Sequence, residues 1–185
     1  MTTGLLISKN MKETFICLIL KGAQSGRVED FRPISLVTSM YKLLAKVLAT
    51  GLREVLQTCV VEEQNAFVLG RQMLDSNLIA SEEMEFATKK NMRGFVLKLD
   101  FAKAYDRVDW AFLNSVLSRK GFGERWRKWI HGCVSTANYK VLINGCPERK
   151  FDGKRGLRQG DPLSPFLFIL VADVLGRMIG SAQEP

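Results

Sequence analysis

The sequence predicts an α+β fold, on three observations. Strand-like, β-branched segments and segments with helical spacing alternate irregularly along the 185 residues, unlike the regular strand–helix repeat of a parallel α/β sheet. Asn144-Gly145 lies between two strand-like segments, which is a strong hairpin signal. Hydrophobic residues make up 46% of the chain, which is enough for a packed core and too many for a disordered segment.

The first half predicts one strand and two helices. Residues 14–20 are β-branched and apolar and precede a glycine-containing turn, which indicates a strand. Apolar residues recur at helical spacing over 44–56, with Thr38 or Ser39 available as the N-cap. A second helix is predicted over 73–90, with acidic residues on its outer face.

The second half opens with a predicted strand over 94–100 that ends on Asp100. Asp109 is well placed to cap the helix that follows it, and Gly121 to end that helix. Asn144-Gly145 joins the two strands of the hairpin. The helices predicted in this half cover 110–120, 125–135 and 167–178.

Composition excludes several classes of protein. The longest apolar runs, 15–20 and 165–172, are far shorter than the roughly 20 residues that a bilayer requires, so no membrane span is predicted. The first ten residues carry no secretory signal, and we therefore expect an intracellular chain. Four scattered cysteines and a single histidine, His131, give no zinc-ligand spacing.

Positive charge is concentrated in residues 119–158. This window holds 11 basic and three acidic side chains and nets +8, which equals the net charge of the whole chain. A polyanion is the natural partner for such a surplus, because neutralised phosphates release their counterions. A solvated surface is the structural alternative.

The first candidate motif is KLDFAKAYDRVDW, residues 98–110. A carboxylate at the end of a buried strand is held rigidly, and Mg²⁺ is bound by one or two carboxylates together with phosphate oxygens and water. Asp100 is therefore the candidate metal ligand. A purely structural role is the alternative for Asp100, and capping is the simpler role for Asp106 and Asp109.

The second candidate motif is RGLRQGDPLSP, residues 155–165. Its glycines let the backbone approach a ligand closely, its prolines stiffen the exit, and Arg158 and Gln159 supply hydrogen-bond donors. A tight turn is the alternative. Together with Asp100 and the basic window, this loop favours a nucleotide or nucleic-acid site, and we expect Asp100 and Gln159 to meet in one pocket.

These two motifs, with FRPISLVTSMYKLLAKVLATGL upstream, closely resemble the reverse transcriptases of non-LTR (LINE-type) retrotransposons, especially those of plants. The resemblance extends from about Thr14 to Gln183, with the motifs in the family's order. It implies a right-hand polymerase fold, with fingers in 1–93 and a partial palm in 94–185. It also implies RNA-directed DNA synthesis from an RNA template, a DNA primer and deoxynucleoside triphosphates (dNTPs).

The resemblance also implies roles for individual residues. Asp100 and the backbone carbonyl of Phe101 would bind the two Mg²⁺ ions of phosphoryl transfer. Tyr105 matches the aromatic residue beneath the incoming sugar, where its ring selects against a 2′-hydroxyl; core packing is its alternative role. Gln159 and Gly160 match loop residues that line the incoming nucleotide and the template base.

Several basic residues match positions that contact phosphates. Arg32 and, less closely, Lys21 match residues of the fingers that neutralise the triphosphate, although Arg32 could instead be an ordinary surface arginine. Arg71 lies in a segment of the fingers that is associated with the template. In the basic window, nucleic-acid contacts are predicted for Arg125, Lys128, Arg155 and Arg158.

One part of the family's catalytic site is missing from this sequence. The third palm motif of the family, a hairpin with two adjacent aspartates, supplies the other carboxylates around the metals, and the 185 residues contain no Asp-Asp pair. We therefore expect a polymerase fragment that is truncated before this hairpin and the thumb, is inactive alone and binds Mg²⁺ weakly or not at all. The alternative is a non-catalytic remnant that binds RNA or an RNA–DNA hybrid.

Overall fold

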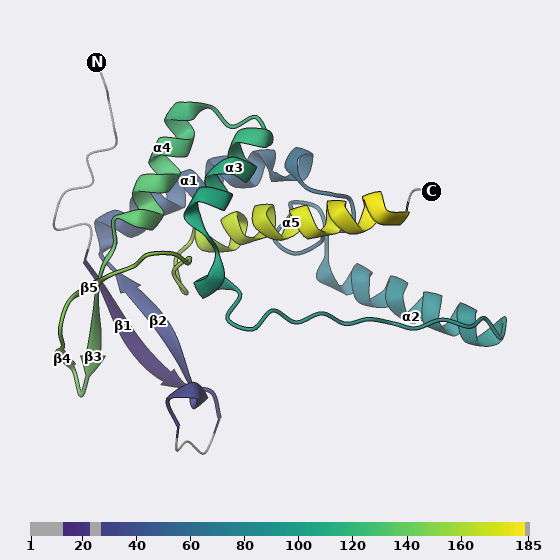
Figure 1. Cartoon of the computed structure of the whole chain (residues 1–185), viewed down its shortest axis with the longest axis horizontal. Coiled ribbons are helices and arrows are strands. Elements are labelled where there is room, and N and C mark those ends of the chain that lie inside the picture. Colours follow the sequence, from purple (N-terminus) through teal and green to yellow (C-terminus); the bar gives the residue numbers. More distant parts are fainter. Residues whose placement is uncertain (1–12, 23–26, 184–185) are drawn as a thin grey trace.

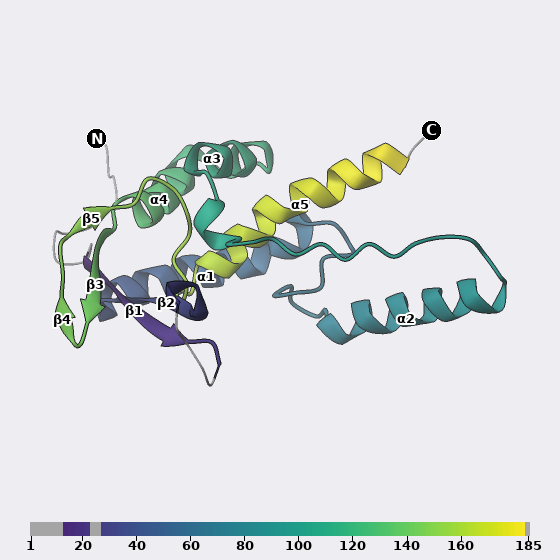
Figure 2. The ribbon, with the colours of Figure 1, turned by 60° about the horizontal axis from the view of Figure 1, so that its bottom comes forward.

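The structure, a computed structural model, describes residues 13–22 and 27–183. A small sheet lies at one end of the molecule and a group of helices occupies the centre (Figure 1). One helix and the segment that returns from it project away from both, as a second view also shows (Figure 2). The α+β class predicted from the sequence is confirmed.

The sheet combines strands from both halves of the chain. Its central pair is β1 (Glu13–Leu20) and β3 (Asn138–Ile143), which run parallel. β2 (Phe31–Val37) pairs antiparallel with β1 after a short 3₁₀ turn, η2 (Val28–Asp30). Two short strands, β4 (Cys146–Pro147) and β5 (Phe151–Asp152), pair antiparallel with β3.

Local sequence signals position the helices and the hairpin. The Thr38 hydroxyl accepts a hydrogen bond from the Tyr41 amide at 3.3 Å, and the Asp109 carboxylate accepts one from the Phe112 amide at 2.7 Å, so both predicted caps are confirmed. Asn144-Gly145 has positive φ at both residues, as a two-residue hairpin loop requires. The helices are α1 (Ser39–Cys59), α2 (Met73–Lys89), α3 (Trp110–Arg119), α4 (Glu124–Ser135) and α5 (Ser164–Gln183).

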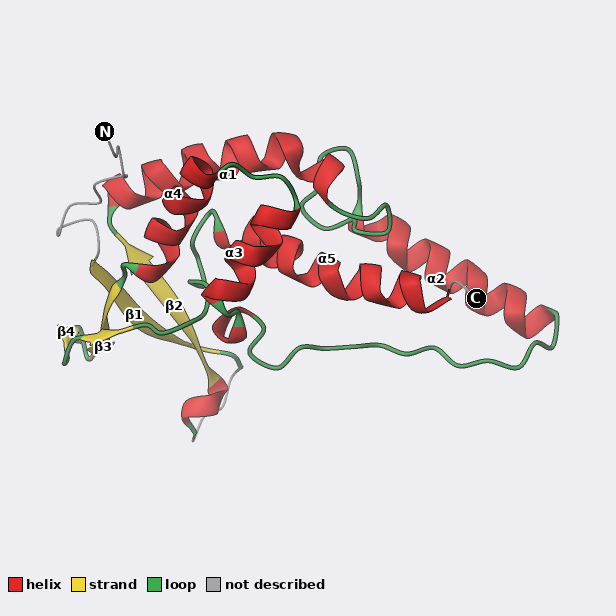
Figure 3. Cartoon of the chain, turned by 45° about the horizontal axis from the view of Figure 1, so that its top comes forward, coloured by secondary structure: helices red, strands yellow, loops and turns green. Residues whose placement is uncertain are grey.

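The hydrophobic core lies between α1, α3, α4 and α5 (Figure 3). Its most deeply buried large side chains come from all four helices and include Leu52, Leu56, Leu113, Leu117, Ile130, Leu167 and Leu170. The core therefore includes residues of the range expected to form the fingers and of the range expected to form the palm. The boundary between those regions stays a prediction.

An ion cluster around the buried Asp173 carboxylate joins three of these helices. The Asp173 carboxylate on α5 accepts hydrogen bonds from Lys120 Nζ at 2.5 Å, from Arg177 Nε at 2.7 Å and from the Val61 amide at 2.7 Å. Lys120 and Arg177 also donate to the carbonyl of Cys59, the last residue of α1. These five contacts fix the end of α1 against α3 and α5.

The predicted strand over 94–100 is wrong. Residues 92–100 have no regular secondary structure and are exposed, although their apolar composition is typical of a strand. A strand is held by hydrogen bonds to a neighbouring strand, and the described part of the chain places no strand beside this segment. Asp100 is therefore not at the end of a sheet.

Within the described ranges, α5 is the one helix that is long and apolar enough to cross a membrane. The sequence predicted no membrane span, because it was judged by uninterrupted apolar runs. Asp173 and Arg177 interrupt the apolar stretch but do not end the helix. The core helix of a globular domain passes the same test. Leu167, Leu170 and Asp173, in the first half of α5, are buried against α1 and α3, whereas residues 176–182 are exposed.

Candidate functional site

The two sequence motifs meet through their backbones. Before α3, a 3₁₀ turn, η3 (Tyr105–Arg107), presents the Tyr105 carbonyl to the Leu157 amide, which donates a hydrogen bond at 2.8 Å. The Gly156 amide donates to the Val108 carbonyl at 2.8 Å, and the Trp110 indole nitrogen donates to the Gly156 carbonyl at 2.8 Å. The first motif is thereby fixed to the start of the glycine-containing loop of the second.

A buried polar network holds the rest of that loop. The Tyr41 hydroxyl donates to Asp161 Oδ2 at 2.5 Å, and Asp161 Oδ1 accepts a hydrogen bond from the Leu163 amide at 2.9 Å. Burial, and then the negative charge of Asp161, raises the pKa of the Tyr41 hydroxyl, which therefore stays protonated as a donor. Because Tyr41 lies on α1, the network ties the loop to the core.

Arg158 belongs to this network, which corrects its predicted contact with nucleic acid. Its guanidinium donates to the Cys133 carbonyl at 2.8 Å, lies 3.5 Å from the Asp161 carboxylate and stacks over the Tyr41 ring at 4.3 Å. Only 6% of the residue is exposed. A buried, paired guanidinium of this kind organises the loop and does not reach a phosphate outside it.

A small cavity of about 190 Å³ opens between the loop and the sheet. Gln159 lines it, half-buried, and the Gln159 carbonyl accepts a hydrogen bond from the Ser35 amide of β2 at 2.9 Å. At Gly160, φ is +90° and a Cβ would lie 3.5 Å from Ile34 Cγ2 and 3.6 Å from the Ser35 carbonyl oxygen. Strands β1, β2, β3 and β5 also contribute lining residues, as does Asp106 of the first motif.

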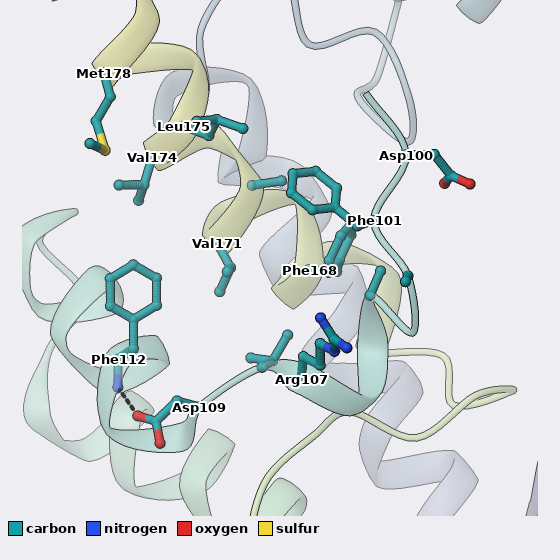
Figure 4. A pocket seen from close by; sticks show the side chains of 14 residues that line it. Asp100, Phe101, Arg107, Asp109, Phe112, Phe168, Val171, Val174, Leu175 and Met178 are labelled. Atoms are coloured by element: carbon teal, nitrogen blue, oxygen red, sulfur yellow. Dashed lines mark hydrogen bonds between the residues drawn. The ribbon is translucent and has the colours of Figure 1, made fainter. Parts of the chain in front are cut away.

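Asp100 lines a different and larger cavity, of about 680 Å³, between the first motif and α5 (Figure 4). Its carboxylate points away from α5, and the Asp109 carboxylate, on the other side of the cavity, accepts a hydrogen bond from the Phe112 amide. Gln159 does not line this cavity, and Asp100 does not line the smaller one. The expectation of a single pocket for both residues is therefore not met.

The donors around Asp100 do not form a magnesium site. In residues 13–22 and 27–183, no three His, Cys, Asp or Glu side chains are grouped so that they could hold a metal ion. Asp100 and the Phe101 carbonyl offer one carboxylate and one neutral oxygen on an exposed segment. Two divalent cations side by side require several carboxylates, so this donor set does not fit the ions that the resemblance implies.

Tyr105 packs against the core. Its ring stacks on Phe168 of α5, with centroids 5.1 Å apart and planes inclined by 15°. Burial raises the pKa of its hydroxyl. This is the core-packing role that the sequence left open, and the contact of the ring with a sugar stays a prediction.

The predicted phosphate contacts of the first half have different surroundings. Arg71 Nη1 donates to the carbonyls of Val61, Glu62 and Gln64 at 2.7, 3.0 and 2.9 Å, so its guanidinium closes the loop after α1. Lys21 Nζ donates to the Glu29 carbonyl at 2.6 Å. Arg32 lies exposed on β2.

The basic window is not a uniform positive surface. Lys120 and Arg158 form ion pairs with buried carboxylates. Lys140 pairs with Glu13, and Lys128 pairs with Glu124. Arg125 is exposed and lies over the Trp129 ring at 4.9 Å. The exposed basic side chains of the hairpin and the loop after it are Arg149, Lys150, Lys154 and Arg155, and they lie among the exposed carboxylates of Glu148 and Asp152.

Sequence reasoning missed the residues that hold the site together. Asp161 follows a glycine and precedes a proline, a position where an aspartate often accepts a hydrogen bond from the backbone two residues on, and this signal could have found it. Tyr41 carried no local signal, because its partner Asp161 lies 120 residues away along the chain.

The fold and the joined motifs are those of a nucleic-acid polymerase of the reverse-transcribing class. Residues 19–183 match the family described as reverse transcriptase (RNA-dependent DNA polymerase). The chain belongs to this family, and the family generally uses Mg²⁺.

The curated relatives are products of retrotransposable elements. The chain is 30% identical over 159 residues to a Pol polyprotein from the element R2 of Popillia japonica. The aligned residues make up 85% of this chain and 22% of that protein. It is 29% identical over 162 residues to an uncharacterized 149 kDa protein of transposon TX1 from Xenopus laevis, covering 88% of this chain and 12% of that protein. Its reverse transcriptase domain is thus related to those of non-LTR elements.

Two further matches differ in extent. An uncharacterized mitochondrial protein of Arabidopsis thaliana is 56% identical over 43 residues, 23% of this chain and 35% of that protein. The structure of apo telomerase from Candida tropicalis, truncated from its C-terminal domain, has a TM-score of 0.54 at 15% identity, covering 97% of this chain and 41% of that one. This match concerns the fold alone.

Proposed function

We propose that this chain forms the fingers, residues 1–93, and part of the palm, residues 94–185, of an RNA-directed DNA polymerase. The observation that carries the proposal is the connection of Tyr105, Val108 and Trp110 to Gly156 and Leu157 by three hydrogen bonds of 2.8 Å. It brings together the two motifs that the family resemblance singles out. The family's substrates, an RNA template, a DNA primer and dNTPs, are the partners proposed for this chain.

In this proposal the smaller cavity binds the base-pairing side of the incoming nucleotide. Gln159 supplies polar atoms at its wall, and the exposed Arg155 at its rim supplies positive charge for phosphates. At Gly160 the φ of +90° disfavours a side chain, whereas the distances of a Cβ to Ile34 and to the Ser35 carbonyl would be ordinary contacts. Arg158 and Asp161 act only by holding this loop in place.

We further propose that the polypeptide of 185 residues does not synthesise DNA alone. Its sequence has no adjacent pair of aspartates, and Asp100 is the one carboxylate that the resemblance assigns to the metals. Purified chain, an RNA template, a labelled DNA primer, dNTPs and Mg²⁺ are expected to give no extension. Extension would overturn this part of the proposal, and an Asp100→Ala variant that extended at full rate would then remove Asp100 from the mechanism.

Binding without synthesis is the second candidate function. It is favoured by the exposed Arg149, Lys150, Lys154 and Arg155 around the hairpin and the smaller cavity. Fluorescence anisotropy with a labelled RNA–DNA hybrid is expected to show binding that weakens steeply with salt.

A matched pair of variants localises this binding. Arg149→Ala/Lys150→Ala is expected to weaken binding and to reduce the salt slope by about one for each lost phosphate contact. The control, Lys42→Ala/Lys46→Ala, removes the same charge from the exposed side of α1. Equal effects of the two variants would mean that net charge, and not the hairpin surface, determines binding.

A further inference from the structure

An aromatic pair lies on the hairpin beside the smaller cavity. Tyr139 of β3 and Phe151 of β5 stand opposite one another in the antiparallel register, and both line that cavity. Their rings are stacked, with centroids 5.6 Å apart and planes inclined by 22°. Cross-strand aromatic pairs stabilise a sheet, so a purely structural role is the interpretation against which any other must be tested.

Phe151 is the exposed member of the pair. It keeps 45% of its surface accessible, whereas Tyr139 is half-buried. A Cβ at Gly153 would lie 2.9 Å from Tyr139 Cε2, so the Gly153 backbone packs closely against the Tyr139 ring. The Tyr139 ring is therefore fixed by its neighbours, and it supports the Phe151 ring while leaving that ring accessible to a ligand.

The residues around Phe151 carry a surplus of positive charge. Residues 148–155 hold four exposed basic side chains and two exposed carboxylates, Glu148 and Asp152, which leaves a net charge of +2. Successive side chains of a strand point to opposite faces, so the Asp152 carboxylate lies on the other face of β5 from the Phe151 ring. Proteins that hold single-stranded nucleic acid combine positive charge, which contacts phosphates, with aromatic rings on which bases stack.

A stacking ring distinguishes a single strand from a duplex. In a duplex each base is already stacked between its neighbours and paired, and exposing its face costs free energy. In a single strand a base can turn its face to an aromatic side chain. The Phe151 ring is therefore expected to add affinity for a single strand and none for an RNA–DNA hybrid.

We infer that Phe151, supported by Tyr139, is a stacking platform for one unpaired base of a single-stranded nucleic acid. The basic side chains of residues 149–155 contact the phosphates of the same strand. The contact does not depend on the base sequence, because every base has a π face. The inference rests on the proposed function, since it takes the hairpin as a nucleic-acid surface, and it adds the residue that holds the single strand beside the smaller cavity.

The test compares two labelled single strands that have the same phosphates. One is an oligothymidine of about 12 nucleotides, and the other has the same backbone with an abasic site at every position. Fluorescence anisotropy with the purified chain is expected to show about tenfold tighter binding of the oligothymidine, as the stacking of one base predicts. Phe151→Ala is expected to remove this tenfold preference and to leave the affinities for the abasic strand and for an RNA–DNA hybrid within about twofold.

Three further variants separate stacking from the stability of the hairpin. Phe151→Leu keeps an apolar contact with Tyr139 but has no π face, and it is expected to lose the preference as Phe151→Ala does. Phe151→Tyr keeps a ring and is expected to bind both strands as the original chain does. Phe86→Ala removes a ring of similar exposure, 53%, from α2, which lies far from the sheet (Figure 1), and is the control.

Failure of the inference is distinguishable from failure of the proposed function. Equal binding of the two single strands by the original chain, or a Phe151→Leu variant that keeps the full preference, overturns the inference and leaves the nucleic-acid surface in place. Loss of affinity for both strands alike in Phe151→Leu overturns it too, because the ring would then only stabilise the hairpin. An original chain that binds neither single strand nor hybrid overturns the inference together with the proposed function.

Discussion

Gly156 lies directly against the backbone of Asp106. Its φ is +95°, and a Cβ at this position would lie 3.0 Å from the Asp106 carbonyl oxygen and 3.1 Å from the Asp106 Cα. Both the backbone conformation and the close approach require glycine. The contact between the two motifs thus depends on the absence of a side chain at one residue.

Gly156→Ala is expected to lower the free energy of unfolding by about 1–3 kcal/mol, because alanine is strained at this φ and its Cβ would separate the motifs. Urea unfolding followed by circular dichroism measures the change. Gly180→Ala on the exposed side of α5, where nothing lies within 4 Å of the added Cβ, is the control. It is expected to stabilise by about 0.5–1 kcal/mol, and a Gly156→Ala variant as stable as the original chain would contradict the close contact.

Asp173 makes the stability of the fold depend on pH. Burial favours the neutral form of Asp173, but the hydrogen bonds from Lys120, Arg177 and the Val61 amide outweigh it and lower the pKa of the carboxyl. A group whose pKa is lowered on folding contributes stability that is fully present above its ordinary pKa of about 3.9 and is lost as the pH falls through the lowered value.

Asp173→Asn is therefore expected to lose about 3 kcal/mol of unfolding free energy at pH 7, since it leaves the Lys120 ammonium in the core without its anionic partner. The deficit relative to the original chain is expected to shrink below about pH 4, where the original loses the contribution too. Unfolding curves at several pH values measure this. Asp75→Asn, on the exposed side of α2, is the control and should show no such convergence. A deficit at pH 7 that persists unchanged at low pH would argue against the ion cluster.

Local signals in the sequence predicted most of the helices and the hairpin. Thr38 and Asp109 precede apolar helical patterns and cap them, and Asn144-Gly145 has the backbone that its turn type requires. These signals act within a few residues, so they can be read without the fold. The segment 94–100 has a strand's composition but no pairing partner in the described chain, and composition alone does not supply one.

The site was less predictable, because its contacts join distant residues. The two motifs were correctly singled out, but their connection through the Tyr105 and Gly156 backbones involves atoms that every residue has. The charge of Arg158 predicted contact with a polyanion, whereas the fold places a carboxylate and a carbonyl around it. Charge in a sequence does not distinguish a buried partner from an external one.

Substitutions of the two arginines of the second motif, Arg155 and Arg158, are expected to have different effects on stability and on binding. Arg158→Ala leaves the Asp161 carboxylate in the core without its cation and is expected to cost about 3 kcal/mol of unfolding free energy. Arg155→Ala removes an exposed side chain and is expected to change stability by less than about 0.5 kcal/mol, while weakening binding of an RNA–DNA hybrid. Urea unfolding and anisotropy on the same preparations measure both effects. An Arg158→Ala variant with normal stability and weakened binding would restore the contact predicted from the sequence.

The cysteines are expected to differ in reactivity because their surroundings differ. Cys133 is fully buried, and burial, followed by the negative charge of Asp161, raises the pKa of its thiol to about 12. Cys146 on the hairpin is exposed. Because the thiolate is the reactive form, iodoacetamide at pH 8 is expected to alkylate Cys146 first and Cys133 only as the chain unfolds, as measured by peptide mass spectrometry over time. In concentrated guanidinium chloride both thiols should react at similar rates, which controls for their intrinsic chemistry. Equal rates in the native chain would mean that the loop and α4 do not enclose Cys133, and the network around Arg158 and Asp161 would lose its support.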